Sequence, residues 1–406
     1  MQNALKKSEE LYQYKNKISN HRILYVVFGI IIMLCLGTVY SWSIFRPTIE
    51  NVFHIGSTRS GLPYMFSLLF YALFMCFTGK YIEKFKPGTI IIFGGLLAAA
   101  GWILAGSAGN IYWLTLFYGV MIGSGVGIAY GVPMNVAAKW FPEKKGLMIG
   151  MVLIGFGGSP LFTAPFAKFL MDIYGVMRTF QILGVIFGIC ITILALFIKY
   201  PSEEIIVNIS GQEIANQTDT KAMIKSTNFK KLYITFIIGT MIGLMIVGMT
   251  GNVGIELIRI SPAKAASFTS LFAIFNGIGR PAFGWFADRI SHKKAMLVSY
   301  FLILVAATLM LLAGSGDSII YIIAFSLFWL NLGGWLAIAP ATTMSLFGER
   351  NYSRNYGIVF TAYGIGAIAG VATSGLLKDF FQSYHEIFYL IILLCIIGIM
   401  AARKID

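Results

Sequence analysis

The chain has 406 residues, of which 57% are hydrophobic and only 12% are charged. An average soluble domain is roughly one quarter charged, so this composition excludes an ordinary soluble protein and indicates an integral membrane protein. The formal net charge of +14 would suit a nucleic-acid-binding protein, but the basic residues fall in alternate loops between apolar segments and form no single patch.

Apolar segments long enough to span a bilayer recur along nearly the whole chain. A hydrocarbon core about 30 Å thick needs roughly 20 helical residues. No cleavable signal peptide is expected, because the first 22 residues are polar and lead directly into a full-length span. The sequence predicts an all-α integral membrane protein with twelve transmembrane helices at 23–45, 60–79, 88–107, 111–138, 146–170, 176–198, 232–253, 262–284, 295–314, 318–346, 355–377 and 385–402.

The basic residues predict the orientation of these spans. Of the 31 Lys and Arg residues, 23 lie in the N-terminal segment, the loops after even-numbered spans and the C-terminal tail, and seven lie in the other loops. Because cytoplasmic loops carry the excess of Lys and Arg, both termini are expected in the cytoplasm of a multi-pass protein of the plasma (inner) membrane. No nucleic-acid partner is expected.

Cysteine and histidine residues give no sign of a metal or redox site. The four cysteines are scattered in apolar segments without metal-ligand spacing, and the four histidines fall at helix ends or in loops. The cysteines suit small buried hydrophobic positions. We expect no metal and no cofactor.

The chain is divided near its middle into two similar halves. The longest polar interruption, residues 200–231, separates six spans from six, and GKYIEKFKPG at Gly79 is repeated 205 residues later as GWFADRISHKK at Gly284. Two pseudo-symmetric six-helix bundles are therefore expected. The predicted segments are a cytoplasmic N-terminal segment (1–22), the first bundle (23–199), a cytoplasmic central loop (200–231), the second bundle (232–402) and a cytoplasmic tail (403–406).

The repeated motif has a glycine, three further residues, an acid and a base. Its members are Gly79, Glu83 and Lys84 in the first copy and Gly284, Asp288 and Arg289 in the second. The glycine lets neighbouring helices approach closely, and the charges can bond helix ends in one conformation. The motif resembles the signature of the major facilitator superfamily. That resemblance implies a substrate site near the midplane between two rocking bundles, with the motif acting in gating.

Four further stretches narrow the resemblance. They are YSW (40–42), YGVPMNVAAKWFPEKKGLMIG (130–150), NGIGRP (276–281) and SRNYG (353–357). Together they resemble the oxalate/formate antiporter family, which is related to the monocarboxylate transporters. The resemblance implies that Arg280 binds the substrate carboxylate and that Tyr40 and Tyr130 line the site. Other positions of the family's site are occupied by Phe156, Leu332, Leu336 and Phe360, and more loosely by Tyr118, Trp329, Asn331 and Trp335.

Arg280 is the one basic residue deep within a predicted span. It lies eight residues before Asp288, or about 12 Å along a helix. A charge at that depth costs a few kcal/mol or more and marks a functional site by default. No acid of a predicted span is available to pair with it, and a guanidinium offers a planar fork that fits a carboxylate. An arginine satisfied by backbone carbonyls and water is the alternative.

Two positions depart from the pattern of the relatives. Asn276, on the same helix face, stands where animal monocarboxylate transporters usually carry an Asp. Because Asn cannot titrate, it would orient the guanidinium or a substrate hydroxyl, or serve only in helix packing. Oxalate-exchanging members have a second cation at the register of Tyr363. A single cation suits a monoanion, because an unpaired buried charge is costly.

These observations predict a secondary active transporter of small monocarboxylates, such as lactate, pyruvate or formate. Its expected partners are a small carboxylate anion, the lipid bilayer and, in a symport, a proton, and the expected unit is a monomer. Glu256 is the best protein candidate for proton coupling, with an exposed helix-end charge as the alternative. Oxalate/formate exchange and a non-transporting carboxylate sensor remain open. An enzyme is not expected, because paired carboxylates, metal ligands and a nucleophile are absent at the predicted membrane depth.

Overall fold

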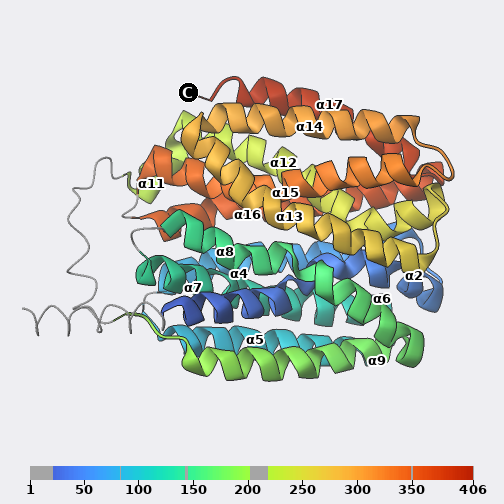
Figure 1. The fold of residues 1–406 in the computed structure, drawn as a ribbon, viewed down its shortest axis with the longest axis horizontal. Coiled ribbons are helices and arrows are strands. Elements are labelled where there is room, and N and C mark those ends of the chain that lie inside the picture. The colour runs from blue at the N-terminus through green and yellow to red at the C-terminus, as the bar shows by residue number, and fades with distance from the viewer. Residues whose placement is uncertain (1–21, 83, 142–144, 202–217, 349–350, 406) are drawn as a thin grey trace, which may run out of the picture.

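The computed structural model describes residues 22–82, 84–141, 145–201, 218–348 and 351–405. Within these ranges the chain is helical and contains no strand. Figure 1 shows long helices running side by side, with the first half of the chain (blue to green) below the second half (yellow to red). The blue start of the described chain and the C-terminus lie at one end of the helices, which we call the terminal end. The opposite end is called the distal end.

The first half begins with the segment Arg22–Phe53, which contains helical residues 22–36, the 3-10 turn η1 (Gly37–Ser41) and α2 (Trp42–Phe53). The elements that follow are α3 (Ser57–Ser60), α4 (Leu62–Tyr81), α5 (Pro87–Ala105), α6 (Ile111–Leu114), the π-helical segment η2 (Thr115–Ile122), α7 (Gly123–Trp140), α8 (Lys145–Gly157) and α9 (Ser159–Phe197). At Gly175 the backbone has φ 76° and ψ 167°, a conformation essentially restricted to glycine, and α9 reverses direction there.

The second half begins after the central loop with the short helix α11. Its elements are α11 (Thr220–Lys225), α12 (Thr227–Asn252), the π-helical turn η4 (Val253–Leu257), α13 (Pro262–Arg289), α14 (His292–Leu312), α15 (Ser318–Phe347), α16 (Tyr352–Phe381) and α17 (His385–Ala402). Among them, α12 packs on α15 and α16, α13 on α15, and α14 on α15 and α17. In the first half α5 packs on α7 and α9, and α4 packs on α7. The contacts between the halves run mainly from α4 to α16, from α13 to α8 and α9, and from α2 to α12.

The helices have the length and composition of membrane spans. Ten described helical segments are long and apolar enough to cross a bilayer. One of them, Leu147–Phe197, has 51 residues and contains the predicted fifth and sixth spans on either side of Gly175. The 28-residue helix α13, the predicted eighth span, is not among the ten. The count is therefore consistent with twelve predicted spans, and the protein is an all-α, multi-pass membrane protein of two helical bundles.

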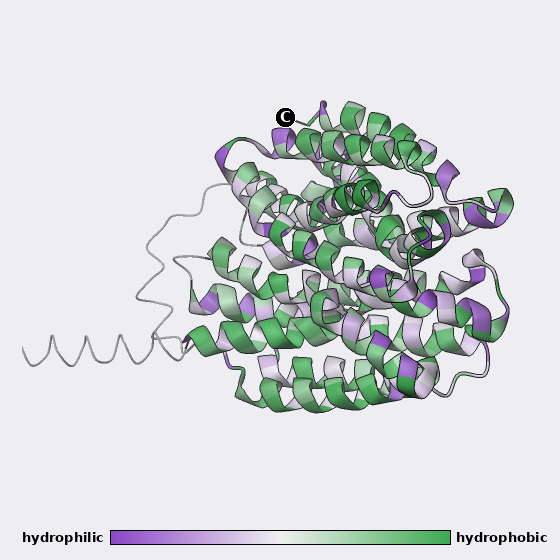
Figure 2. Ribbon diagram, turned by 45° about the vertical axis from the view of Figure 1, so that its right-hand side comes forward, coloured by the Kyte–Doolittle hydropathy of each residue, from purple (hydrophilic) through white to green (hydrophobic). Residues whose placement is uncertain are grey.

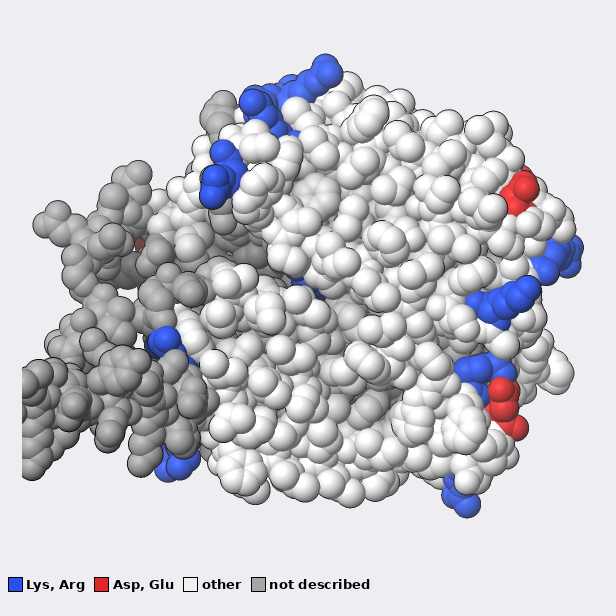
Figure 3. Space-filling view, in the orientation of Figure 1, with Lys and Arg blue, Asp and Glu red and all other residues white. Residues whose placement is uncertain are grey.

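Polar and apolar residues are distributed as a bilayer requires. Figure 2 shows hydrophobic residues along the outer faces of the helices and hydrophilic residues mainly at their ends. In the view of Figure 3 the charged side chains gather at the two ends of the molecule, and the belt between them is almost free of charge. Such a belt matches the hydrocarbon core of a membrane.

The first span is longer than predicted, and the added residues include a buried arginine. The prediction ended it at residue 45, whereas the helix continues to Phe53. Arg46 is therefore inside a span and is only 1% exposed. The prediction that Arg280 is the only basic residue deep within a span is wrong for this reason.

Candidate functional site

Arg280 is held in the second half of α13 by close helix packing. Its side chain is 2% exposed. A Cβ at Gly279 would collide with the carbonyl oxygen of Leu330 on α15, and one at Gly333 would collide with the carbonyl oxygen of Asn276. These glycines let α13 and α15 approach backbone to backbone. The guanidinium is thereby carried on a tightly packed helix pair rather than on a mobile loop.

The guanidinium of Arg280 is poorly satisfied. Its Nη2 donates to Asn276 Oδ1 at 3.5 Å, the long limit of a hydrogen bond. Its Nε and Nη1 have no hydrogen-bond partner among the described residues, and neither has Asn276 Nδ2. The guanidinium carbon lies 5.9 Å from the centre of the Phe156 ring, which offers a weak cation–π contact. A permanent cation is thus buried with donors still available.

Arg46, the other buried arginine among the described residues, provides an internal comparison. All of its guanidinium nitrogens donate. Nε bonds Ser60 Oγ at 2.9 Å and Glu50 Oε1 at 3.3 Å, Nη1 bonds the Gly248 carbonyl at 2.9 Å, and Nη2 bonds the Ser57 carbonyl at 2.7 Å. A buried arginine with a structural task in this protein is therefore fully paired, whereas Arg280 is not.

Aromatic side chains from both bundles surround the Arg280 site. The hydroxyls of Tyr40 in the first bundle and Tyr363 in the second are hydrogen-bonded at 2.7 Å. The ring of Phe156 lies 5.2 Å from that of Tyr40 and 5.0 Å from that of Tyr130, and Phe360 stacks on Tyr363 at 4.8 Å. The structure thus brings together five of the predicted site residues, which we call the aromatic cage.

Tyr71 on α4 belongs to the same cage, although it was not predicted. Its ring centre lies 5.0 Å from that of Tyr130, 5.7 Å from Phe156, 5.2 Å from Phe360 and 5.5 Å from Tyr363. A signal for it exists in the sequence, because Tyr71 lies 205 residues before Asn276, which is the offset of the internal repeat.

Other aromatic candidates lie elsewhere. Tyr118 packs against Trp42 at 4.6 Å in the core of the first bundle. Trp329 donates its Nε1 hydrogen to Thr250 Oγ1 at 3.1 Å within the second bundle. These contacts are those of ordinary core residues, so neither side chain is positioned as part of the aromatic cage.

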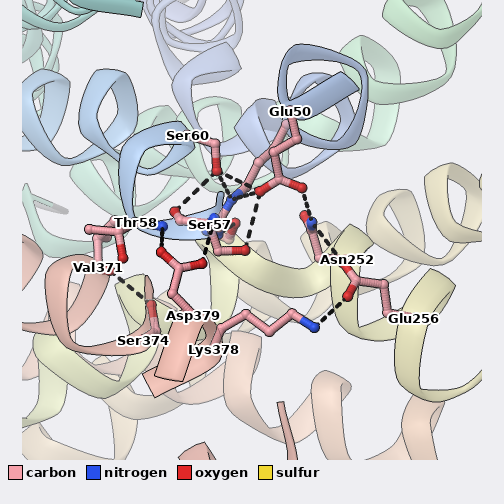
Figure 4. Close-up of polar contacts among 12 residues, drawn as sticks. Glu50, Ser57, Thr58, Ser60, Asn252, Glu256, Val371, Ser374, Lys378 and Asp379 are labelled. Carbon is pink, nitrogen blue, oxygen red and sulfur yellow. Dashed lines mark hydrogen bonds and ion pairs between the residues drawn. The ribbon is translucent and has the colours of Figure 1, made fainter. Parts of the chain in front are cut away.

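Glu256 lies at the distal end, away from Arg280. It pairs with Lys378 Nζ at 2.7 Å, and Asn252 Nδ2 donates to Glu256 Oε1 at 3.4 Å and to Glu50 Oε2 at 3.0 Å. Figure 4 shows Asn252 between the two carboxylates. Arg280 is 18 residues beyond the distal start of α13, or about 27 Å along the helix. The coupling candidate and the arginine are therefore in separate sites.

Hydrogen bonds between the two bundles gather at this distal end. The carboxylate of Asp379 on α16 accepts from the backbone N–H groups of Ser57 and Thr58 in the first bundle, both at 2.9 Å. The Asn252 bond to Glu50 and the Arg46 bond to the α12 backbone also cross between the bundles. We call these contacts of Arg46, Glu50, Asn252 and Asp379 the distal network. It joins the two bundles at the distal end.

The repeated motif at the terminal end is only partly described. Glu83 lies outside the described residues, and so does the side chain of Asp288. Lys84 Nζ lies 5.4 Å from the centre of the Tyr81 ring, and the guanidinium carbon of Arg289 lies 6.0 Å from the Trp285 ring. The gating role predicted for Gly79, Glu83, Lys84, Gly284, Asp288 and Arg289 stays a prediction.

Two helical bundles with an under-paired charged site between them are typical of secondary transporters. The chain belongs to the Major Facilitator Superfamily, whose family model matches residues 27–344 and 234–405. It is therefore a transporter and not an enzyme.

Comparison with individual proteins agrees with this assignment. The chain is 28% identical over 354 residues to the oxalate:formate antiporter of Oxalobacter formigenes, covering 86% of this chain and 83% of that protein. It is 23% identical to monocarboxylate transporter 13 of Rattus norvegicus, covering 75% and 70%. An inward-facing, unoccupied bacterial homologue of the human lysosomal transporter Spinster has the same fold, with a TM-score of 0.72, 13% identity and coverage of 94% and 97%. The resemblance found in the sequence motifs is confirmed.

Proposed function

We propose that this protein is a secondary active transporter of small monocarboxylates, such as lactate, pyruvate or formate, working by alternating access. The observation that carries the proposal is the buried, under-paired guanidinium of Arg280. Leaving a buried charge unpaired is costly, and a carboxylate is the group that best fits the planar donors of arginine. Asn276, Tyr40, Tyr130 and Tyr363 form the supporting shell.

The number of buried cations supports a monoanion. Arg46 and Arg280 are the charged side chains among the buried described residues, and Arg46 already has a carboxylate partner. The register at which oxalate exchangers carry a second cation holds Tyr363, whose hydroxyl bonds Tyr40. One free guanidinium neutralises one carboxylate, so a dianion would leave a charge unpaired at the site.

In an alternating-access mechanism, the bonds of the distal network break each time the distal end opens. An anion between the bundles reaches one side of the membrane only after one end opens. We place the protein in the plasma (inner) membrane as a monomer with both termini in the cytoplasm, so the distal end faces outward. Closure of that end by Asp379, Asn252 and Arg46 then corresponds to an inward-directed site.

Proton symport is the proposed coupling, because a monoanion and a proton together cross without net charge. Glu256, paired with Lys378 at the distal end, is the proposed coupling residue. A protonophore should lower the uptake of labelled lactate into proteoliposomes that carry a proton gradient. Uptake that is indifferent to the protonophore would exclude proton coupling.

Oxalate/formate exchange is the second candidate, and the 28% identity to an oxalate:formate antiporter favours it. Exchange of preloaded oxalate for external formate by the wild-type protein would support it and would refute the argument from charge number. A carboxylate sensor is the third candidate. It would bind an acid without moving it, so binding without counterflow would identify it.

The deciding experiment is counterflow of labelled lactate, pyruvate, formate, oxalate and acetate in proteoliposomes. Removing one partner of a buried ion pair costs about 3–5 kcal/mol, so Arg280→Ala should lose at least about 100-fold in transport efficiency. Arg178→Ala is the matched control, because Arg178 is exposed on α9 and bonds Gln181 there, away from the contacts between the bundles. Full activity of the Arg280→Ala protein, with the control also active, would show that Arg280 is structural.

A further inference from the structure

We propose that Tyr71 is a specificity-determining residue of this site, and that its hydroxyl bonds the oxygen on carbon 2 of a 2-hydroxy or 2-oxo acid. The inference rests on the proposed function, because it assumes that Arg280 holds the carboxylate of the same acid. It selects lactate and pyruvate over acids of equal size that lack this oxygen.

The hydroxyl of Tyr71 is buried. Tyr71 is 1% exposed, and its hydroxyl has no partner at ordinary hydrogen-bonding distance among the described residues; the neighbouring phenol is Tyr130, with ring centres 5.0 Å apart. A buried hydroxyl without a partner costs free energy, and native proteins keep few such groups. A group that lacks a protein partner at a binding site is available to a ligand.

Tyr71 is also placed next to the other groups of the site. Its ring centre lies 5.0 Å from that of Tyr130 and 5.5 Å from that of Tyr363. The Phe156 ring, 5.9 Å from the guanidinium carbon of Arg280, lies 5.7 Å from the ring of Tyr71. Tyr40 and Tyr363 already bond each other. Tyr71 thus adds a hydroxyl from the first bundle, with no described residue at ordinary hydrogen-bonding distance, to a site whose cation comes from the second.

The internal repeat relates Tyr71 to a residue that contacts Arg280. Tyr71 and Asn276 occupy equivalent positions in the two halves, 205 residues apart. Asn276 contacts the guanidinium and also has a free amide donor, Nδ2. The two halves therefore place uncharged hydrogen-bonding groups at matching points on either side of the site. Uncharged groups of this kind can hydrogen-bond the neutral oxygen of a substrate while Arg280 pairs with its carboxylate.

The chemistry of the acid matches this arrangement. In lactate and pyruvate the second polar group is on the carbon next to the carboxylate, so a site that fixes the carboxylate also fixes that oxygen. A phenol can donate to a ketone oxygen and can donate to or accept from a hydroxyl. A site built to bond a substrate oxygen rejects the analogue that lacks it, because its own polar group is then left unpaired.

Another buried tyrosine provides a matched control. The hydroxyl of Tyr118 also has no hydrogen-bond partner among the described residues. Its ring packs on Trp42 and Trp102 in the core of the first bundle. Tyr118→Phe removes the same atom as Tyr71→Phe, outside the aromatic cage.

The test compares transport efficiency for lactate with that for propionate, which has the same carbon skeleton without the oxygen on carbon 2. The wild-type protein should prefer lactate, and Tyr71→Phe should lower that preference about tenfold while propionate transport continues. Tyr118→Phe should leave the preference unchanged.

Each outcome of this test either supports or overturns the role proposed for Tyr71. If the wild-type protein moves lactate without preferring it to propionate, the inference is wrong, whatever the stability of the variant. An unchanged preference in Tyr71→Phe, or an equal loss in a control, also overturns it while leaving the proposed transport intact. Wild-type protein that moves no carboxylate overturns the proposed function and this inference together.

Discussion

The substitution Asp379→Asn should open the distal end of the protein. Asp379 accepts two backbone hydrogen bonds from the other bundle, from the N–H groups of Ser57 and Thr58, both at 2.9 Å. An asparagine keeps one acceptor oxygen and turns its amide hydrogens toward the second N–H group. One charge-assisted bond becomes an ordinary one and the other is lost, which costs about 2 kcal/mol.

That free energy changes the ratio of closed to open molecules about 30-fold. A protein whose distal end is closed in about 99 of 100 molecules would then be closed in about three of four. The substitution changes the equilibrium between conformations and not the contacts of Arg280. Asp379 lies at the distal end, whereas Arg280 lies 18 residues beyond the distal start of α13. Carboxylate affinity, measured at equilibrium, should change much less than the conformational ratio.

Spin labels at the distal end measure this change directly. Arg59 in the first bundle and Ser315 in the second are exposed there, so cysteines at these two positions report the distance between the bundles. The native cysteines, Cys35, Cys76, Cys190 and Cys395, must first be replaced. Double electron–electron resonance should show a longer distance population in Asp379→Asn that is minor in the parent.

A matched control separates this mechanism from a general charge effect. Asp172 is also near the distal end, but it pairs with Lys168 within α9. Asp172→Asn removes the same charge without touching a contact between the bundles, so its distance distribution should match the parent. Identical distributions for Asp379→Asn and the parent, or an equal shift in both variants, would refute the proposed role of the distal network.

Three further predictions concern the site and the fold. In Gly157→Val the new Cβ would lie 2.8 Å from Arg280 Nε, so counterflow should fall at least about tenfold. Gly150→Val on the same helix, where a Cβ meets nothing within 4 Å, should not affect it. Gly175→Ala forces alanine into φ 76° and should cost about 2 kcal/mol, seen as a lower melting temperature of the detergent-solubilised protein. Tyr363→Lys should add oxalate to the transported acids, and failure to do so would weaken the argument from charge number.

The sequence predicted the helices and the central arginine because both signals are local. Span length follows from hydropathy, and Arg280 is conspicuous in an apolar run. The length of the first span was missed because Arg46 and Glu50 made its end look like a loop. Arg46 is buried and Glu50 is half-buried through contacts with Ser57, Ser60 and the α12 backbone, which no local pattern contains.

Tyr71 was missed for a different reason. The chain has 20 tyrosines, and most aromatic residues of a membrane protein pack in cores or face lipid. Only the packing of α4 against α16 distinguishes Tyr71 from the others. The repeat offset relates Tyr71 to Asn276. That relation indicates a binding role only because the structure places Asn276 beside a guanidinium whose Nε and Nη1 have no partner among the described residues.

The bonds made by Asp379 also bear on how α3 is folded. This helix has only four residues, and its N-cap, Gly56, has no side chain that could bond the first N–H groups. The capping carboxylate comes instead from the other bundle, and a Cβ at Gly56 would lie 2.9 Å from it. When the bundles separate at the distal end, α3 loses its cap, and so short a helix is not stable alone. Opening of this end is then coupled to local unfolding, and faster amide hydrogen exchange at residues 57–60 would report it.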